Sequence, residues 1–88
     1  MKTKFQNIKV GTYGQRKTLE ARDHEISEYN DEPYKPSELT KIVMRYVTDN
    51  KVKTDFNSLV SLSKEIDDYG YSLIIEPSGE LLLYDTDY

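Results

Sequence analysis

The only histidine, His24, is the first side chain to consider for chemistry, and acidic residues surround it. On a helix, His24 and Glu28 would lie four residues apart on one face, where both could contact a metal ion. A structural or catalytic zinc site needs at least three protein ligands, so these two are too few. A solvent-facing histidine in an acidic stretch explains the pattern better. The sequence therefore predicts no metal and no cofactor.

Nucleophilic catalysis would need a Ser, Thr or Cys beside a base that a third group orients. The chain has no cysteine and no Gly-x-Ser-x-Gly turn. Its segment Gly11-Thr12-Tyr13-Gly14 has the glycines of a phosphate-binding loop but lacks the Gly-Lys-Ser/Thr ending, so it is typical of an ordinary turn. The sequence therefore predicts a protein that is not an enzyme.

Charge is segregated along the 88 residues, which carry 16 acidic and 12 basic side chains for a net charge of −4. Residues 1–22 hold six basic groups and one acid, and residues 23–34 hold five acids and no Lys or Arg. Residues 35–53 hold five basic groups and two acids, and residues 54–88 hold eight acids and one lysine. The acidic C-terminal half indicates a partner that is basic or that normally binds phosphates.

The first 36 residues predict weaker elements than the rest. A short edge strand is expected around residues 5–10, followed by the turn at 11–14. A helix over residues 18–29 would place Leu19, Arg22, Ile26 and Tyr29 near one face. Residues 30–36 contain two prolines within four positions, so they predict a loop.

Residues 37–88 predict a helix–helix–hairpin unit. A helix over 37–50 begins at an N-cap, Ser37, and has one apolar stripe, formed by Leu39, Ile42, Val43, Tyr46 and Val47. A second helix over 56–69 begins after Asp55 or Asn57 and ends at Gly70. The β-rich runs 71–76 and 80–85 flank Pro77-Ser78-Gly79 and predict an antiparallel hairpin.

Together these elements predict one small α+β domain over residues 1–88, with an N-terminal strand or arm, two or three helices and a C-terminal antiparallel β-hairpin. The hairpin is apolar on both faces at its centre, so the N-terminal segment or a second subunit should cover the face that the helices leave open. A homodimer is therefore possible. No apolar stretch approaches the ~20 residues that span a membrane, and the N-terminus lacks the apolar segment of a secretory signal. We expect a cytoplasmic protein without membrane contact.

Carboxylates along a helix end and a hairpin rim can imitate the phosphates of DNA and occupy the basic groove of a DNA-binding protein. Tyrosine adds contact area with one polar tip. We expect a non-enzymatic inhibitor that blocks a basic nucleic-acid-binding protein of a host cell by DNA mimicry and does not itself bind nucleic acid. The bland alternative is an acidic surface that only keeps the domain soluble. The candidate partner-binding residues are the acids and tyrosines of the C-terminal half: Glu65, Asp67, Asp68, Tyr69, Tyr71, Glu76, Glu80, Tyr84, Asp85 and Asp87.

The chain is short, rich in Lys, Asp, Asn and Tyr, and without Cys or Trp. In these respects it resembles the small proteins that bacteriophages make to inhibit host machinery. The resemblance implies a host protein as the target, and it assigns no role to any residue.

Two other functions stay open. Helix, short connection, helix and hairpin is the order of a winged-helix DNA-binding domain. Its reading helix would carry Lys64 alone against three acids, so DNA binding would depend on the basic N-terminal residues Lys2, Lys4, Lys9, Arg16, Lys17 and Arg22. Those residues could instead pair with the acidic segment 23–32. The third possibility is an adaptor subunit whose hairpin adds strands to a partner's sheet.

Overall fold

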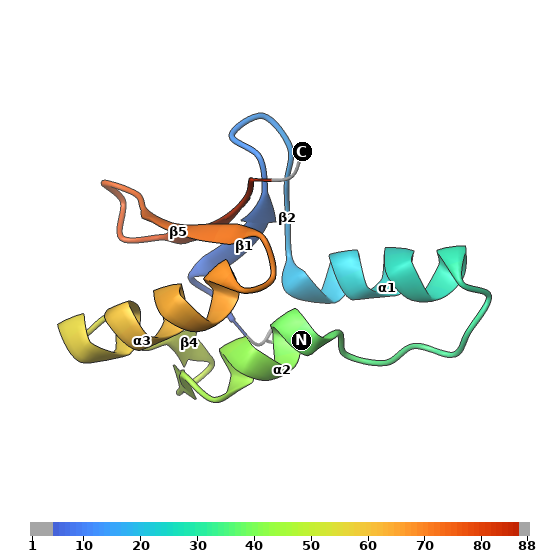
Figure 1. Ribbon diagram of the computed structural model, residues 1–88, viewed down its shortest axis with the longest axis horizontal. Coiled ribbons are helices and arrows are strands. Elements are labelled where there is room, and N and C mark those ends of the chain that lie inside the picture. The colour runs from blue at the N-terminus through green and yellow to red at the C-terminus, as the bar shows by residue number, and fades with distance from the viewer. Residues whose placement is uncertain (1–4, 87–88) are drawn as a thin grey trace.

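A computed structural model gives the fold of this chain and describes residues 5–86 (Figure 1). It contains three helices, a four-stranded mixed sheet and a separate two-stranded hairpin. In chain order the elements are β1 (Ile8–Gly11), β2 (Arg16–Lys17), α1 (Leu19–Tyr29), α2 (Glu38–Met44), β3 (Val47–Thr48), β4 (Lys51–Val52), α3 (Phe56–Asp67), β5 (Tyr71–Ile75) and β6 (Leu81–Asp85). The predicted α+β class is confirmed.

The four strands of the sheet are arranged in the order β2-β1-β6-β5. β1 runs parallel to β6, and the β1–β2 and β5–β6 pairs are antiparallel. The expectation of an edge strand near residues 5–10 is therefore wrong, because β1 lies between β2 and β6. Ile8 aligns with Leu81 and Val10 with Leu83, so β1 contributes its apolar residues to the middle of the sheet.

The hydrophobic core lies between the sheet and the helices, which pack on one of its faces (Figure 1). Strand residues Val10 and Leu83 are fully buried, as are Leu62 and Ile66 on α3 and Val43 on α2. Burying a side chain of this size stabilises the fold by roughly 1.5–3 kcal/mol. The core therefore joins the N-terminal strand to the helix–helix–hairpin unit in a single packed domain.

The N-terminal segment also covers part of the opposite face of the sheet. Leu82 points away from the helices, yet it is completely buried. On this face the ring of Tyr13, from the β1–β2 turn, lies 5.0 Å from the ring of Tyr84. Arg16 Nη1 lies 2.5 Å from Glu76 Oε1. The sequence predicted that either the N-terminal segment or a second subunit covers the second face of the hairpin, and in the structure the N-terminal segment does so.

α1 begins at Thr18, whose hydroxyl accepts a hydrogen bond from the backbone N–H of Ala21. This confirms the helix predicted over residues 18–29, but not the face that it buries. The buried residues are Leu19, Asp23 and Ser27, spaced four apart, whereas Tyr29 is 91% exposed. Asp23 is buried on this face because the Thr40 hydroxyl of α2 donates a hydrogen bond to its carboxylate.

α2 is shorter than the helix predicted over residues 37–50. Its N-cap is Ser37, as expected, but the helix ends at Met44 and the chain then forms the β3–β4 hairpin. The two loop residues, Asp49 and Asn50, have φ angles of 54° and 65°. Positive φ at both central positions is the requirement of the type I′ turn, which Asp and Asn tolerate better than most residues. The hairpin therefore replaces the last turns of the predicted helix.

α3 and the C-terminal hairpin follow the prediction closely. Asp55 is the N-cap of α3 and accepts a hydrogen bond from the backbone N–H of Ser58. Gly70 has a φ of 83°, a conformation that glycine adopts without steric cost, and it ends the turn between α3 and β5. None of the helices within residues 5–86 has both the length and the apolar composition that crossing a bilayer requires.

Candidate partner-binding surface

The predicted acids at the end of α3 do not form a uniformly acidic surface. Glu65, Asp68 and Tyr69 line a hollow of about 430 Å³ between α2 and α3, and Lys41 and Arg45 line the same hollow. Arg45 Nη2 lies 2.9 Å from Glu65 Oε1. Two cations therefore share this hollow with the acids.

Glu65 is also held by Tyr46, which follows the C-terminal end of α2. The hydroxyl of Tyr46 donates a hydrogen bond to the Glu65 carboxylate. This bond raises the pKa of Tyr46 above its ordinary value of 10.0 because it favours the protonated phenol. The Glu65 carboxylate thus has two partners within the fold. It is less available to a second protein than a solvated carboxylate.

The other predicted acids lie apart from one another. Asp67 is exposed, and no ion pair involves it within the described part of the chain. Glu76 forms its ion pair with Arg16 on the sheet face opposite the helices. Glu80, after the hairpin turn, lines a hollow that also contains Lys51 and Lys53.

Tyr71 and Asp85 belong to the interior side of the sheet. Tyr71 is 8% exposed, and its hydroxyl accepts a hydrogen bond of 2.7 Å from Arg22 Nη2. Asp85 lines a pocket of about 210 Å³ with Tyr71, Arg22 and Glu25. Tyr84 lies on the opposite face, against Tyr13, and Asp87 falls outside the described residues. The nine predicted residues that the structure describes thus point in several directions and share no single surface.

Of the four basic N-terminal residues that the structure describes, three form ion pairs within the fold. Lys17 Nζ lies 2.5 Å from Glu25 Oε2, and Arg22 Nη1 lies 3.8 Å from Asp23 Oδ1. Arg16 is paired with Glu76. These contacts fit the pairing of basic residues with segment 23–32 better than a DNA-binding patch. The connection between α2 and α3 also contains the β3–β4 hairpin, unlike the short connection of a winged helix.

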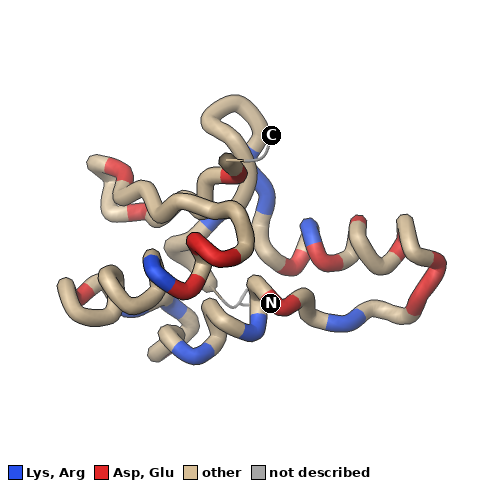
Figure 2. Tube along the Cα trace, in the orientation of Figure 1, with Lys and Arg blue, Asp and Glu red and all other residues tan. Residues whose placement is uncertain are grey.

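The structure points instead to an acidic arm, which we define as residues 24–34. It comprises the outer part of α1 and the segment that returns toward α2, and it projects from the body of the domain (Figure 1). Figure 2 shows acidic residues along α1 and at the turn beyond it. No Lys or Arg occurs among residues 24–34. The arm is therefore an acidic projection from an otherwise mixed surface.

Exposed aromatic and aliphatic side chains lie among these acids. Tyr29 projects almost entirely into solvent, and Ile26 and Tyr34 are also exposed. Glu28 and Asp31 form no ion pair within residues 5–86. Glu32 forms a solvent-exposed ion pair, with its Oε2 3.2 Å from Lys35 Nζ. A fully exposed tyrosine between unpaired carboxylates is typical of a contact surface, because tyrosine combines a large apolar ring with one polar tip.

The end of α1 places Asp31 in a conformation that favours glycine. The backbone N–H of Glu32 donates to the carbonyl of Ser27 at 2.9 Å, and that of Asp31 donates to the carbonyl of Glu28 at 3.1 Å. These two bonds form a Schellman motif with Asp31 at the left-handed position, where its φ is 54°. Glu28 also lies in the last turn of α1, where the helix dipole disfavours an acid. Local stability alone would not select acids at these two positions.

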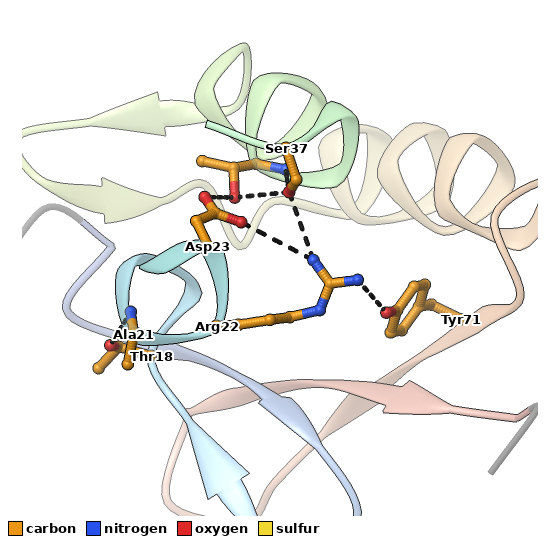
Figure 3. A network of polar contacts seen from close by, with 7 residues as sticks. Thr18, Ala21, Arg22, Asp23, Ser37 and Tyr71 are labelled. Carbon is orange, nitrogen blue, oxygen red and sulfur yellow. Dashed lines mark hydrogen bonds and ion pairs between the residues drawn. The ribbon is translucent and has the colours of Figure 1, made fainter. Parts of the chain in front are cut away.

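A buried polar network attaches the arm to the domain (Figure 3). Asp23 is 1% exposed, and its Oδ2 accepts a hydrogen bond of 2.6 Å from the Thr40 hydroxyl on α2. Arg22 donates to the Ser37 hydroxyl at 3.3 Å and to the Tyr71 hydroxyl at 2.7 Å. Arg22 thus links α1 to the N-cap of α2 and to β5. This network fixes the direction in which α1 leaves the sheet.

The return segment of the arm lies against α1. The rings of His24 and Tyr34 are stacked, with centroids 4.1 Å apart. Burial, and the charges of Asp23 and Glu20, raise the pKa of Tyr34 above its ordinary value of 10.0. His24 therefore contributes its ring to the packing of the return segment on α1. Within the described residues, no group of three or more Asp, Glu or His side chains is placed to hold a metal ion.

The charge pattern of the sequence contained the signal for this arm, since residues 23–34 hold five acids and no Lys or Arg. Sequence reasoning assigned binding to the C-terminal half because its total charge is larger. It could not show which of those acids are paired with cations in the fold. Comparisons with protein-family models, with curated proteins and with solved structures found no match to this chain.

Proposed function

We propose that this protein is a non-enzymatic binding protein that blocks a basic, nucleic-acid-binding surface of a host protein, as a phage-type inhibitor would. The supporting observation is the acidic arm, which presents unpaired carboxylates around an exposed tyrosine. The arm takes the place of DNA in the partner's groove. Its carboxylates replace phosphates and its aromatic ring replaces part of the base surface.

Each carboxylate that meets a basic groove displaces counterions from the partner, so the complex weakens as salt rises. Glu28 and Asp31 matter most in this proposal because neither charge is compensated within the described fold. Tyr29, which lies between them in sequence, supplies the apolar contact. Complementary charge also steers association, so much of the salt effect falls on the association rate.

The proposal predicts opposite effects on stability and on binding at Asp31. Asp31→Gly relieves a left-handed residue at the helix end and should raise the free energy of unfolding by about 0.5–1 kcal/mol. The same change removes a contact carboxylate and, combined with Glu28→Gln, should weaken partner binding by at least about tenfold, or ~1.4 kcal/mol. A variant that is more stable but binds less well separates the contact role of Asp31 from any structural role.

The experiment is a capture from bacterial lysate with the tagged protein, washed at low and at high salt, with mass spectrometry of the retained proteins. The expected result is a basic DNA-binding protein that is lost at high salt, displaced by added duplex DNA and poorly captured by the Glu28→Gln, Asp31→Gly variant. Recovery of nucleic acid on the bait itself would contradict the proposal and favour a DNA-binding regulator. A salt-resistant partner would contradict it and favour an adaptor.

The control for position is Asp68→Asn, which removes one acid at the C-terminal end of α3, as Asp31→Gly alone does at the end of α1. If the arm makes the contact, this variant captures the partner as well as the unaltered protein does. If Asp68→Asn weakens capture and the arm variant does not, the contact surface lies between α2 and α3 and the role given to the arm is wrong.

A further inference from the structure

A pocket of about 210 Å³ lies at the end of the sheet where the parallel strands β1 and β6 reach their carboxyl ends. Gly11 and Thr12 line it at the end of β1, Asp85 lines it at the end of β6, and α1 contributes Arg22 and Glu25. In open α/β sheets, the space outside the carboxyl ends of parallel strands is where ligands commonly bind. The volume is below the roughly 300–1,000 Å³ of sites for drug-sized molecules, so the pocket suits a small ligand.

The guanidinium group of Arg22 is held in a fixed position at this pocket (Figure 3). Within residues 5–86 it donates hydrogen bonds to the hydroxyls of Ser37 and Tyr71, which use two of its five N–H donors. Its side chain is 25% exposed, so the charge is partly shielded from water but still reachable. A guanidinium that the fold already orients can bind a carboxylate through its other donors at little further cost in side-chain entropy.

An acid lies beside this arginine on the same face of the sheet. Tyr71 of β5 aligns with Asp85 of β6. Aligned side chains of antiparallel strands share one face, with Cβ atoms about 4.5–5.5 Å apart. The side chain of Asp85 therefore leaves the sheet next to Tyr71, whose hydroxyl contacts Arg22. A carboxylate has about four acceptor sites, so Asp85 can receive an ammonium group in addition to its contacts within the fold.

The charges that line the pocket are balanced. Lys17 and Arg22 are cationic, whereas Glu25 and Asp85 are acidic. A small anion would be repelled by the two carboxylates, and a small cation would be repelled by the lysine and the arginine. A molecule that carries one charge of each sign can place each charge against its opposite and avoid both repulsions. The lining therefore favours a small zwitterion.

We propose that this pocket binds a free α-amino acid with a small side chain. The carboxylate of the ligand accepts hydrogen bonds from Arg22, its ammonium group donates to Asp85, and its side chain packs against Val10 at the pocket wall. One carbon atom separates the two charged groups of an α-amino acid, which suits a cation and an acid that both lie beside Tyr71. Lys17 and Glu25 are more exposed, and they keep their ion pair of 2.5 Å at the outer side of the pocket.

The test is titration of the isotope-labelled protein with glycine, alanine and serine in turn, followed by the backbone amide spectrum. We expect a dissociation constant of about 1 mM or lower, with the largest shifts at Gly11, Thr12 and Arg22. Amino acid at about 10 mM should then raise Tm by at least about 5 °C. Acetate and methylammonium, which carry the two charges separately, should each bind at least about tenfold more weakly.

Two results with the unaltered protein would overturn the proposal. One is an amide spectrum and a Tm that none of the three amino acids changes at about 50 mM. The other is binding of acetate as tight as that of the amino acids, because the site would then select an anion alone. Neither result depends on the folding of a variant.

A pair of variants tests the assigned role of Asp85. Asp85→Asn keeps the shape of the side chain and removes its charge, so it should raise the dissociation constant at least about tenfold. Asp67→Asn removes an exposed acid of α3 that does not line the pocket, and it should leave the constant unchanged. Equal affinities of these two variants would contradict the contact between Asp85 and the ammonium group. The arm variant Glu28→Gln, Asp31→Gly should bind the amino acid normally, so failure of this inference is distinct from failure of the proposed function.

Discussion

Replacing Thr40 by valine should destabilise this domain by removing the one hydrogen bond that the described residues 5–86 donate to a buried carboxylate, that of Asp23. Asp23 is almost completely buried, and its Oδ2 accepts the Thr40 hydroxyl at 2.6 Å. Its Oδ1 has no hydrogen bond within the described residues and lies 3.8 Å from Arg22. Valine has nearly the same shape as threonine but no donor. After the change, the carboxylate would keep only the charge of Arg22.

The expected cost follows from this geometry. A hydrogen bond to a charged group contributes about 1.5–3 kcal/mol, and leaving the buried acceptor unpaired adds to the loss. We expect Thr40→Val to lower the free energy of unfolding by about 2–3 kcal/mol. For a domain of this size, each kcal/mol lowers Tm by about 4–8 °C, so Tm should fall by about 8–24 °C. The hydrogen bond from Ser37 to Thr40 is lost as well.

The assay is urea unfolding followed by circular dichroism, with thermal unfolding as a second measure. Thr40→Ser keeps the hydroxyl and loses one buried methyl group, so it should cost about 1 kcal/mol. Thr54→Val alters an exposed threonine and should change stability by less than about 0.5 kcal/mol. If Thr40→Val and Thr40→Ser have the same free energy of unfolding, the Thr40 hydroxyl does not stabilise the buried Asp23 carboxylate. The network would then not anchor the arm.

Two further changes test local features of the fold. Hydrogen bonds from Ser58 lower the pKa of Asp55 below its ordinary value of 3.8. The ionised Asp55 carboxylate therefore stabilises the fold above pH 3.8, and this contribution is lost as the pH falls through the lower pKa of the folded state. Asp55→Asn should keep the cap but reduce the loss of stability on acidification, which urea unfolding at neutral and acidic pH would measure. Asn50→Gly should stabilise the β3–β4 turn by about 0.5 kcal/mol, and Asn50→Ala should destabilise it by about 1 kcal/mol, because a φ of 65° suits glycine and strains alanine. The same unfolding assay measures both variants. Equal stability of the two would contradict the turn assignment.

Elements whose ends are marked by caps could be predicted from the sequence. Ser37, Asp55 and Gly70 mark helix ends with local chemistry, and the structure uses all three as expected. The early end of α2 was missed because the apolar spacing of Tyr46 and Val47 also fits a helix. The signal for the hairpin was the Asp49-Asn50 pair between two short β-rich runs.

The position of β1 and the pairing of charges depend on tertiary contacts that local patterns do not contain. β1 aligns with β6, more than 70 residues later, and nothing in its four residues specifies a parallel neighbour. The same holds for the ion pairs that occupy Glu65 and Glu76. The acidic arm could have been found from its run of acids, but its projection from the domain depends on the contacts of Asp23 and Arg22.

The parallel pairing of β1 with β6 has a consequence for how this protein folds as it is synthesised. Translation proceeds from the N-terminus, so β1 and all three helices are synthesised before residues 81–85 exist. Until then the strand between β1 and β5 is missing, so Ile8 has no paired neighbour and Val10 pairs only with Lys17 of β2. The helices can form locally, but the packed domain must wait for β6. We therefore expect a nascent chain that stops before residue 81 to be readily digested by protease, and full protection to appear only once β6 has emerged.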